Sequence, residues 1–599
     1  MHDFEETTRH HSDSKIFGRL MSYAGPYKKN FIIASLIMLI DVGISSLSPM
    51  IFGFIINLID TDASNTYKFT ILIYFVLILI GIMALTLLMT YFQQILLQIA
   101  GQKIVHRIRG EVFEHIEKLS LGQFNAIPLG KLITRVTNDT NTLSEMYTSV
   151  ITNLFRNVLL MIVQFSIMMM VNWKVTLIMS ITIPFVAVFT FGYRRIARAQ
   201  YRRSRNAVTA VNAYLQENLS GIKLTQIFNQ EEKKLEEFRI SNKDLRKQRL
   251  REITMFAIYR PTMYLLSMVA TMLVVYYMGV HIVSLIQAGA TSEEIVLQTS
   301  LLFTMYLYGS QFFRPLQNLS EDFNILQSAF ASAEKVFDVL DTPPEIEDSE
   351  DAIVLTDFKG EIEFKNVWFY YIEDEWVLKD VSFKIKPNDT VAFVGATGSG
   401  KTTIMNLIVR NYDTIKGQIL IDGIDIKKIK LDSLRKEVGQ MPQDVFLFTG
   451  SISSNIALKD DSITNERIKE ASHYVGADSF IEELPDTYDH IVRERGNNFS
   501  TGQRQLLSFA RALVYEPTVM ILDEATANID SETEEIIQES LEKMMSISTM
   551  IVVAHRLSTI QKADRIYVLQ KGEIKESGSH QELLKKEGIY HSLYELQYK

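Results

Sequence analysis

The sequence contains no cysteine among its 599 residues. A disulfide framework, a thiolate metal site and a cysteine nucleophile are therefore all excluded. Charged residues are also few, at 22% of the chain, and the net charge is −9. This acidic balance offers no basic surface to a phosphate backbone, so we expect no nucleic-acid partner. The first 30 residues lack an apolar core followed by small residues, so we expect no cleavable signal peptide.

Apolar residues, in contrast, make up 47% of the chain and give a mean hydropathy of +0.07. At this length we expect at least two domains, one in a membrane and one in water. Runs such as FTILIYFVLILIGIMALTLLMTYF leave no polar face for water, which argues against six buried helices of a soluble protein. Six apolar stretches approach or exceed the about 20 residues that cross a bilayer: 31–58, 69–97, 149–171, 174–192, 261–285 and 295–313.

The charges of the loops predict the orientation. Six arginines follow the fourth stretch in YRRIARAQYRRSR, whereas the loop after the first stretch carries Asp60 and Asp62. By the positive-inside rule the arginine side is cytosolic, which predicts a multi-pass protein of the cytoplasmic membrane with both termini in the cytosol. The connections near 98–148 and 193–255 are then helical extensions into the cytosol. Residues 15–29 predict a short amphipathic helix on the inner leaflet, with a plain cytosolic leader as the alternative.

The composition changes at Asp341, where DTPPEIEDSEDAIVLTDFKG is acidic and contains a proline pair, as linkers do. From Gly360 onward, apolar alternation typical of strands is followed by alternating helix and strand patterns. We therefore predict two domains. Residues 1–340 form a transmembrane α-helical domain with six spans, and residues 341–599 form a linker and an α/β P-loop ATPase domain.

The clearest local motif is GATGSGKT, residues 395–402, between the apolar strand TVAFV and the helical run TTIMNLIV. It matches the GxxxxGK(S/T) pattern in the strand, loop and helix context that the pattern requires. Glycines let backbone N–H groups converge on phosphate oxygens, and the helix N-terminus adds positive potential. Lys401 then reaches the outer phosphates, and the Thr402 hydroxyl can bind Mg²⁺.

A second motif, VMILDEAT, is an apolar strand that ends in Asp523 and Glu524. A carboxylate at the end of a buried strand facing a P-loop can hold Mg²⁺ through water, and the next carboxylate can orient an attacking water. The pair could instead only end a strand and cap a helix.

Together with NNFSTGQRQLLSFARAL, these motifs resemble the nucleotide-binding domain of ATP-binding cassette (ABC) transporters, and the six stretches resemble the exporter branch with both domains fused. The resemblance implies ATP and Mg²⁺ as cofactors. It also implies that a second half-transporter chain completes the ATPase, because each ATP lies between the P-loop of one chain and the signature loop of the other, which is FSTGQ (residues 499–503) in this chain. It also implies roles for residues outside the two motifs. Tyr371 would stack on adenine, with Tyr370 as the alternative, and Asp530 would lie in the loop that crosses to the other subunit.

The implied site residues follow from the same resemblance. The catalytic set is Glu524 as general base or water-positioning group, with His555, Gln443 and Lys401. The metal set is Thr402, Gln443 and Asp523. The nucleotide-binding set is Tyr371, Gly395, Thr397, Gly398, Ser399, Gly400, Lys401, Thr402 and Thr403, with Ser500, Gly502 and Gln503 serving the partner's ATP. Coupling segments between the domains are expected near residues 138–143 and 221–228.

The signature loop departs from the family pattern, because FSTGQ stands where LSGGQ is usual. Thr501 adds a β-branched side chain where backbone approach and conformational freedom matter. In this family such departures often mark heterodimers with one full-strength and one degenerate site. We therefore expect a heterodimer, in which this chain lends its altered signature to the partner's weaker site, over a homodimer.

The spans give few indications of the substrate. Asp41 is costly inside a span unless it faces a cavity or a partner, so it predicts either a cation-attracting cavity or an interhelical bond. Arginines near cytosolic ends predict snorkelling or salt bridges, at Arg156, Arg260 and Arg314. Soft side chains predict an adaptable apolar cavity or helix packing, at Phe165, Met168, Met263, Tyr264, Met305 and Tyr306.

The resemblance predicts ATP-driven export of hydrophobic or amphipathic compounds of the multidrug type. A lipid flippase is the alternative within transport, and an ATP-gated channel or a regulatory ABC subunit is the alternative from another class. A soluble ABC ATPase is excluded if the spans insert. A peptide exporter with a fused protease is not expected, because no cysteine could serve as its nucleophile.

Overall fold

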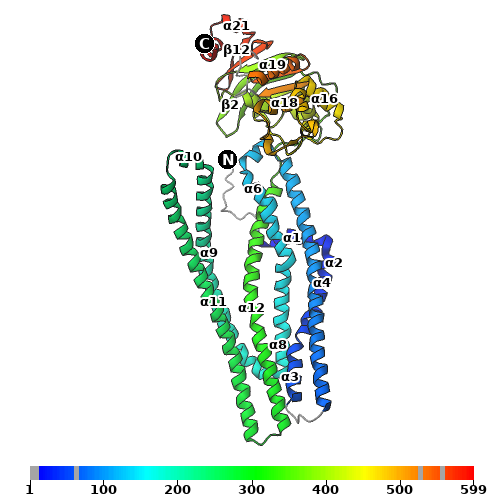
Figure 1. Cartoon of the computed structure of the whole chain (residues 1–599), viewed down its shortest axis with the longest axis vertical. Coiled ribbons are helices and arrows are strands. Elements are labelled where there is room, and N and C mark those ends of the chain that lie inside the picture. Colours follow the sequence, from blue (N-terminus) through cyan, green and yellow to red (C-terminus); the bar gives the residue numbers. More distant parts are fainter. Residues whose placement is uncertain (1–11, 60–65, 524–530, 554–559, 599) are drawn as a thin grey trace. The chain divides into compact units, whose positions relative to one another are not determined.

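The computed structural model describes residues 12–59, 66–523, 531–553 and 560–598 (Figure 1). The chain divides into two compact units. Among the described residues, the helical unit takes those of 12–113 and 133–341, and the sheet unit takes those of 114–132 and 342–598. The predicted domain division at 340/341 remains a proposal, and the structure adds that a short piece of the N-terminal half belongs to the sheet unit.

The N-terminal half is built from long helices, because its apolar stretches are long and continuous. Its elements are α1 (Asp13–Ala24), η1 (Gly25–Tyr27), α2 (Lys28–Ser45), α3 (Ser48–Ile59), α4 (Thr66–Lys118), α5 (Leu121–Ala126), α6 (Leu129–Thr134), the π-helical turn η2 (Arg135–Asp139), α7 (Thr140–Glu145), the π-helical turn η3 (Met146–Val150), α8 (Ile151–Ser180), α9 (Thr182–Ser220), α10 (Ile222–Ile227), α11 (Glu231–Gln287) and α12 (Ser292–Asp341).

Within the described residues, four helical segments are long and apolar enough to cross a membrane: Asp13–Leu58, Thr70–Lys118, Leu129–Ser180 and Glu231–Gln287. The sixth predicted span lies within α12. α9 packs along α11, and α8 packs along α12. Figure 1 shows α10 at the tip of the α9 and α11 pair.

The turn between the third and fourth predicted spans lies at Asn172. Its backbone is not helical (φ −157°, ψ 97°), although helix surrounds it on both sides within α8. The Asn172 side chain accepts a hydrogen bond from the backbone N–H of Val175 (3.2 Å) and so caps the helix that follows. The predicted break at residues 172–173 therefore coincides with a structural break.

The predicted N-terminal amphipathic helix exists as α1, and protein covers part of its apolar side. Ile16 and Leu20 are buried, and α1 packs against α12. Arg19 Nη1 forms an ion pair with Asp341 Oδ1 (2.7 Å), which fixes the helix there. Part of the apolar face of the helix thus packs on α12, while Phe17 is 44% exposed, and the place of the helix on the inner leaflet remains a prediction.

The C-terminal half alternates strands and helices, as the sequence predicts. Its elements are β1 (Ile362–Tyr370), β2 (Trp376–Ile385), β3 (Thr390–Val394), α13 (Lys401–Ile408), β4 (Lys416–Ile421), β5 (Ile424–Asp425), η4 (Ile426–Lys428), α14 (Leu431–Glu437), β6 (Val438–Met441), β7 (Gly450–Ser451), α15 (Ile452–Ile456), α16 (Asn465–Tyr474), α17 (Asp478–Glu482), η5 (Thr487–Asp489), β8 (Ile491–Val492), η6 (Glu494–Gly496), α18 (Thr501–Leu513), β9 (Val519–Asp523), α19 (Ser531–Met545), β10 (Thr549–Val553), β11 (Arg565–Gln570), β12 (Glu573–Gly578), α21 (His580–Lys585) and α22 (Ile589–Tyr598).

The central sheet has the strand order β12-β11-β3-β10-β9-β6. All its pairs are parallel except β11 with β12. Every residue of β3 and of β10 is buried, as expected for parallel strands covered on both faces. A second, antiparallel sheet has the order β2-β1-β4-β5.

The segment that joins the sheet unit from the N-terminal half is centred on α5. Ser120 caps α5 and donates from its hydroxyl to Glu345 (3.0 Å), and Gln123 donates from its amide to the Pro343 carbonyl (2.8 Å). The first predicted coupling segment, 138–143, lies outside this piece, in η2 and α7 of the helical unit, and its coupling role remains a prediction. The second, 221–228, contains the separate short helix α10 and remains a prediction.

Candidate functional site

The candidate site lies at one edge of the central sheet. β3, β10, β9 and β6 are adjacent and parallel, so their carboxyl ends meet at the same edge. Gly395 follows β3, Asp523 ends β9, and Gln443 comes two residues after β6. Residues that are far apart in the sequence are thus brought to one edge by strand order alone.

The loop after β3 has the shape of a phosphate cradle. A side chain at Gly395 would collide with the Leu569 carbonyl oxygen, and one at Gly400 would approach Leu378 Cδ2 to 2.6 Å. Gly400 also has φ +106°, a conformation that other residues rarely adopt. The sequence therefore needs glycine at both positions to form this loop.

Lys401 begins α13 and is 6% exposed. Its ammonium group donates to the carbonyls of Gly395 (2.7 Å) and Ala396 (3.2 Å), so it is held across the loop. The hydroxyl of Ser399 is buried and has no hydrogen-bond partner within the described part of the chain. A buried hydroxyl of this kind needs a ligand atom or water, which fits a loop that binds phosphate.

Tyr371 rather than Tyr370 lies beside this loop. The Tyr371 hydroxyl donates to Thr403 Oγ1 (3.1 Å), in the first turn of the helix that follows the loop, and Tyr371 is 47% exposed. Tyr370 packs edge-on against Trp376, with ring centroids 5.0 Å apart. The open face of Tyr371 is therefore available to a planar base.

Tyr412 is a site residue that the sequence reasoning missed. Its ring lies edge-on to Tyr371 at 5.1 Å, and a side chain at Gly122 of α5 would come within 2.9 Å of it. Burial raises the pKa of the Tyr412 phenol above its usual value. Tyr412 thus connects the aromatic residue beside the phosphate loop to α5. No motif marks it, because both contacts are made by segments distant in the sequence.

The signature loop forms the beginning of α18. Ser500 is the N-cap, and its hydroxyl accepts from the Gln503 backbone N–H (3.2 Å). The Gln503 side chain accepts in turn from the Ser500 backbone N–H (3.0 Å), which completes a capping box. The exposed start of a 13-residue helix presents free N–H groups and positive potential to an anion.

Thr501 has an ordinary helical backbone and is not among the residues with positive φ. The backbone conformation at this position is therefore one that a β-branched residue can adopt, and the effect on the approach of a partner's ATP remains a prediction. What Thr501 adds is bulk at the exposed helix start, where its hydroxyl accepts from Arg504 (3.3 Å). Phe499 is 7% exposed and packs edge-on against Phe480, which makes it a packing residue.

Gln443 is exposed on the loop after β6, and an aromatic pair follows it. Phe446 and Phe448 are 49% and 53% exposed, with centroids 5.1 Å apart, whereas Leu447 between them is buried. Arg511 donates to the Phe446 carbonyl (2.9 Å), and burial lowers the pKa of its guanidinium. The sequence reasoning missed this exposed pair, although the alternation in VFLF predicts it.

Three assigned residues cannot be placed. Glu524 directly follows β9, His555 comes two residues after β10, and Asp530 precedes α19, but all three lie outside the described residues. In the sequence, Glu524 follows β9 and His555 follows β10, which are neighbouring parallel strands of the central sheet.

Asp41 of the helical unit has a partner. It is fully buried, and its Oδ2 forms an ion pair with Arg156 Nη2 of α8 (2.8 Å). This supports the interhelical bond predicted for Asp41 and the salt bridge predicted for Arg156. Met168, Met263 and Met305 are buried in one core of the helical unit, so they pack helices together.

Both parts of the chain match known families. Residues 31–315 match the model described as ABC transporter transmembrane region, and residues 378–527 match the model described as ABC transporter. An ABC transporter ATP-binding protein of Streptococcus pneumoniae is 36% identical over 585 residues, which cover 97% of each chain.

Two other relatives carry more specific names. A Bacillus subtilis ATP-binding/permease protein named for multidrug resistance is 35% identical over 520 residues, covering 86% of this chain and 76% of the relative. An ATP-dependent lipid A-core flippase of Syntrophus aciditrophicus is 34% identical over 584 residues, covering 98% and 95%. Among solved structures, a bacterial Atm1-family ABC exporter with ATP bound superposes with a TM-score of 0.77 at 25% identity, covering 96% of this chain and 98% of that one.

Proposed function

This chain belongs to the ABC transporter family, as an exporter half whose membrane domain and ATPase domain are fused, and we propose that it exports hydrophobic or amphipathic compounds of the multidrug type. ATP hydrolysis in the ATPase domain drives the transport. In our proposal the protein lies in the cytoplasmic membrane with both termini in the cytosol and alternates between inward-open and outward-open states.

The observation that carries the substrate class is a cavity of about 650 Å³ in the helical unit. This volume lies in the range of small-molecule sites. Charged and apolar side chains share its lining, which suits a compound with a polar group on an apolar body. The residues of that lining on which we rely are Glu145, Arg156, Arg314 and Asp322, with Val150, Leu160 and Ile325.

We assign the chemistry at the sheet edge as the family resemblance implies. Glu524 orients the attacking water, while Lys401, Gln443 and His555 stabilise charge on the transferred phosphoryl group. Mg²⁺, held by Thr402, Gln443 and Asp523, would neutralise the phosphate oxygens. Tyr371 and the residues of the phosphate loop hold the nucleotide.

Substituting the catalytic carboxylate tests this assignment. Glu524→Gln should keep ATP binding and lose most hydrolysis, because the amide cannot accept a proton from water. Undiminished turnover would refute the role of Glu524.

Transport itself is tested in inside-out membrane vesicles. A multidrug pump accumulates dyes or drugs when ATP is added, and these compounds stimulate its ATPase. A flippase, as one relative is named, would instead move labelled lipid between leaflets and show no drug stimulation. An ATP-gated passive conductance would favour the channel.

We further propose that the partner is a different half-transporter. The proposal rests on Thr501, whose side chain adds bulk where a partner's ATP would approach the start of α18. Purifying the tagged chain from its native host and identifying what co-purifies tests it. Recovery of only this chain in dimers would establish a homodimer, in which both sites tolerate Thr501.

A further inference from the structure

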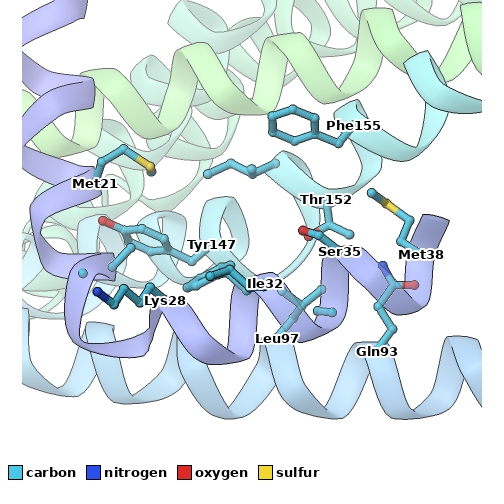
Figure 2. Close-up of a pocket in the computed structure, with 15 residues that line it drawn as sticks. Met21, Lys28, Ile32, Ser35, Met38, Gln93, Leu97, Tyr147, Thr152 and Phe155 are labelled. Atoms are coloured by element: carbon cyan, nitrogen blue, oxygen red, sulfur yellow. The ribbon is translucent and has the colours of Figure 1, made fainter. Parts of the chain in front are cut away.

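A cavity of about 320 Å³ lies in the helical unit where the chain bends from α1 into α2 (Figure 2). It is about twice the volume of an apolar cavity that holds benzene. Six residues of α2 line it: Lys28, Phe31, Ile32, Ala34, Ser35 and Met38. The other walls come from α1, η1, α4, η3 and the start of α8, and they are mainly apolar.

The charged end of this groove is Lys28, on the first turn of α2. Within the described residues, no carboxylate pairs with its ammonium group. Lysines at this level of a span attract the anionic lipids of the cytoplasmic leaflet. The apolar residues Ile32 and Phe155, at the wall, are 56% and 66% exposed, as expected of side chains that meet lipid.

The polar group inside the groove is Gln93 of α4. It is 3% exposed, and its Oε1 has no hydrogen-bond partner in the part of the chain that the structure describes. Figure 2 shows the Gln93 amide inside the pocket beside Ser35 and Met38, away from Lys28. The Oε1 atom needs a donor, whereas the amino group of the same amide can donate to an acceptor oxygen of a ligand in the pocket.

The depth of Gln93 identifies the class of ligand. Asn30 of α2 donates to the Leu96 carbonyl of α4 (3.5 Å), so these two residues are level. At a rise of about 1.5 Å per residue, Gln93 lies about 8 Å farther than Lys28 from the end of the span that we propose to be cytosolic. The headgroup layer of one leaflet is about 5–8 Å thick. A phospholipid with its phosphate at Lys28 therefore has its ester groups at the level of Gln93.

We propose that this pocket binds one anionic phospholipid of the inner leaflet. The phosphate lies at Lys28, an ester carbonyl accepts from the Gln93 amide, and one acyl chain follows the groove past Ile32 to Met38. The proposal does not depend on which compound is exported.

Native mass spectrometry of the full-length chain tests the proposal. The protein is purified in neutral detergent and mixed with phosphatidylglycerol or with phosphatidylcholine of the same acyl chains, and the lipids retained per chain are counted. We expect one phosphatidylglycerol retained in preference to phosphatidylcholine. Lys28→Gln should weaken this retention about fivefold, as expected for one lysine at an anionic surface.

Adjacent residues supply matched controls. Lys29→Gln makes the same charge change at an exposed residue outside the pocket lining, so it should retain phosphatidylglycerol. Ser35→Phe fills the groove and should abolish retention, whereas Leu36→Phe, at an exposed residue outside the lining, should not. Size-exclusion profiles show whether each variant is folded. If Ser35→Phe is not folded, the comparison of Lys28→Gln with Lys29→Gln decides the test.

Three outcomes would overturn the proposal. The first is equal retention of both lipids by the unmodified chain. The second is equal loss in Lys28→Gln and Lys29→Gln, which would indicate general attraction to the membrane surface. The third is full retention by folded Ser35→Phe. Because none of these measurements needs ATP or an exported compound, failure here is distinct from failure of the proposed transport function.

Discussion

The ion pair between Asp41 and Arg156 predicts unequal effects of removing its two members. The Asp41 side chain is 0% exposed, whereas the Arg156 side chain is 31% exposed and lines the cavity of about 650 Å³. Arg156→Met leaves a buried carboxylate without its partner, which costs about 3–5 kcal/mol. Asp41→Asn leaves an arginine that water in the cavity still reaches, which costs about 1 kcal/mol or less.

The double variant isolates the pair. With Asp41→Asn and Arg156→Met together, neither charge remains, and replacing a buried pair by neutral groups is often close to neutral. The double variant should therefore be more stable than Arg156→Met alone, although it carries one more substitution. This recovery is the signature of an uncompensated buried charge.

Thermal unfolding of the purified full-length protein measures the effect. We expect Arg156→Met to have the lowest midpoint, the double variant to recover most of the loss, and Asp41→Asn to lie near the unmodified chain. Equal midpoints for the two single variants, or no recovery in the double variant, would refute the reasoning. If Asp41 instead attracts cationic substrates, Asp41→Asn will lower uptake of cationic dyes in vesicles while the midpoint stays unchanged.

Three further predictions concern the ATPase. Gly400→Ala adds a side chain at φ +106° and toward Leu378, at a backbone cost of about 1–2 kcal/mol. Binding of a fluorescent ATP analogue should therefore fall sharply, and unchanged affinity would contradict the loop geometry. Gly122→Val drives a side chain into Tyr412 and should lower transport more than ATPase activity, whereas Gly130→Val, where an added Cβ meets nothing within 4 Å, should alter neither. Thr501→Gly removes bulk at the start of α18 and should raise ATP turnover in the dimer; the same or a lower turnover would show that Thr501 does not weaken that site.

Some features could be predicted because their physical cause is local. The phosphate loop depends on glycines at fixed spacing before a lysine, and the structure has the conformation at Gly400 that this spacing implies. The break at Asn172 follows from the end of one apolar stretch and the start of the next. The buried strand β3 is marked by five residues without a polar face to water.

Other features could not be read along the chain. The sequence predicts a coupling segment at 138–143, and no local pattern indicated that α5 at Leu121–Ala126 joins the sheet unit. The connection near 98–148 contains several short helices. Which of them contacts the sheet unit depends on which one meets a complementary surface there. Here that surface includes Tyr412, which no local pattern connects to Gly122.

The sequence by itself determined that a helical membrane domain precedes an α/β ATPase, and it predicts that residues 395–402 bind phosphate. Hydropathy and the backbone demands of a phosphate loop act over a few turns of chain, so they are visible in the order of the residues. Only the tertiary structure decided that Asp41 pairs with Arg156, 115 positions away, that Thr501 takes a helical backbone, and that Lys28 and Gln93 line one pocket. Those outcomes depend on which helices pack side by side, and packing is a property of the whole fold.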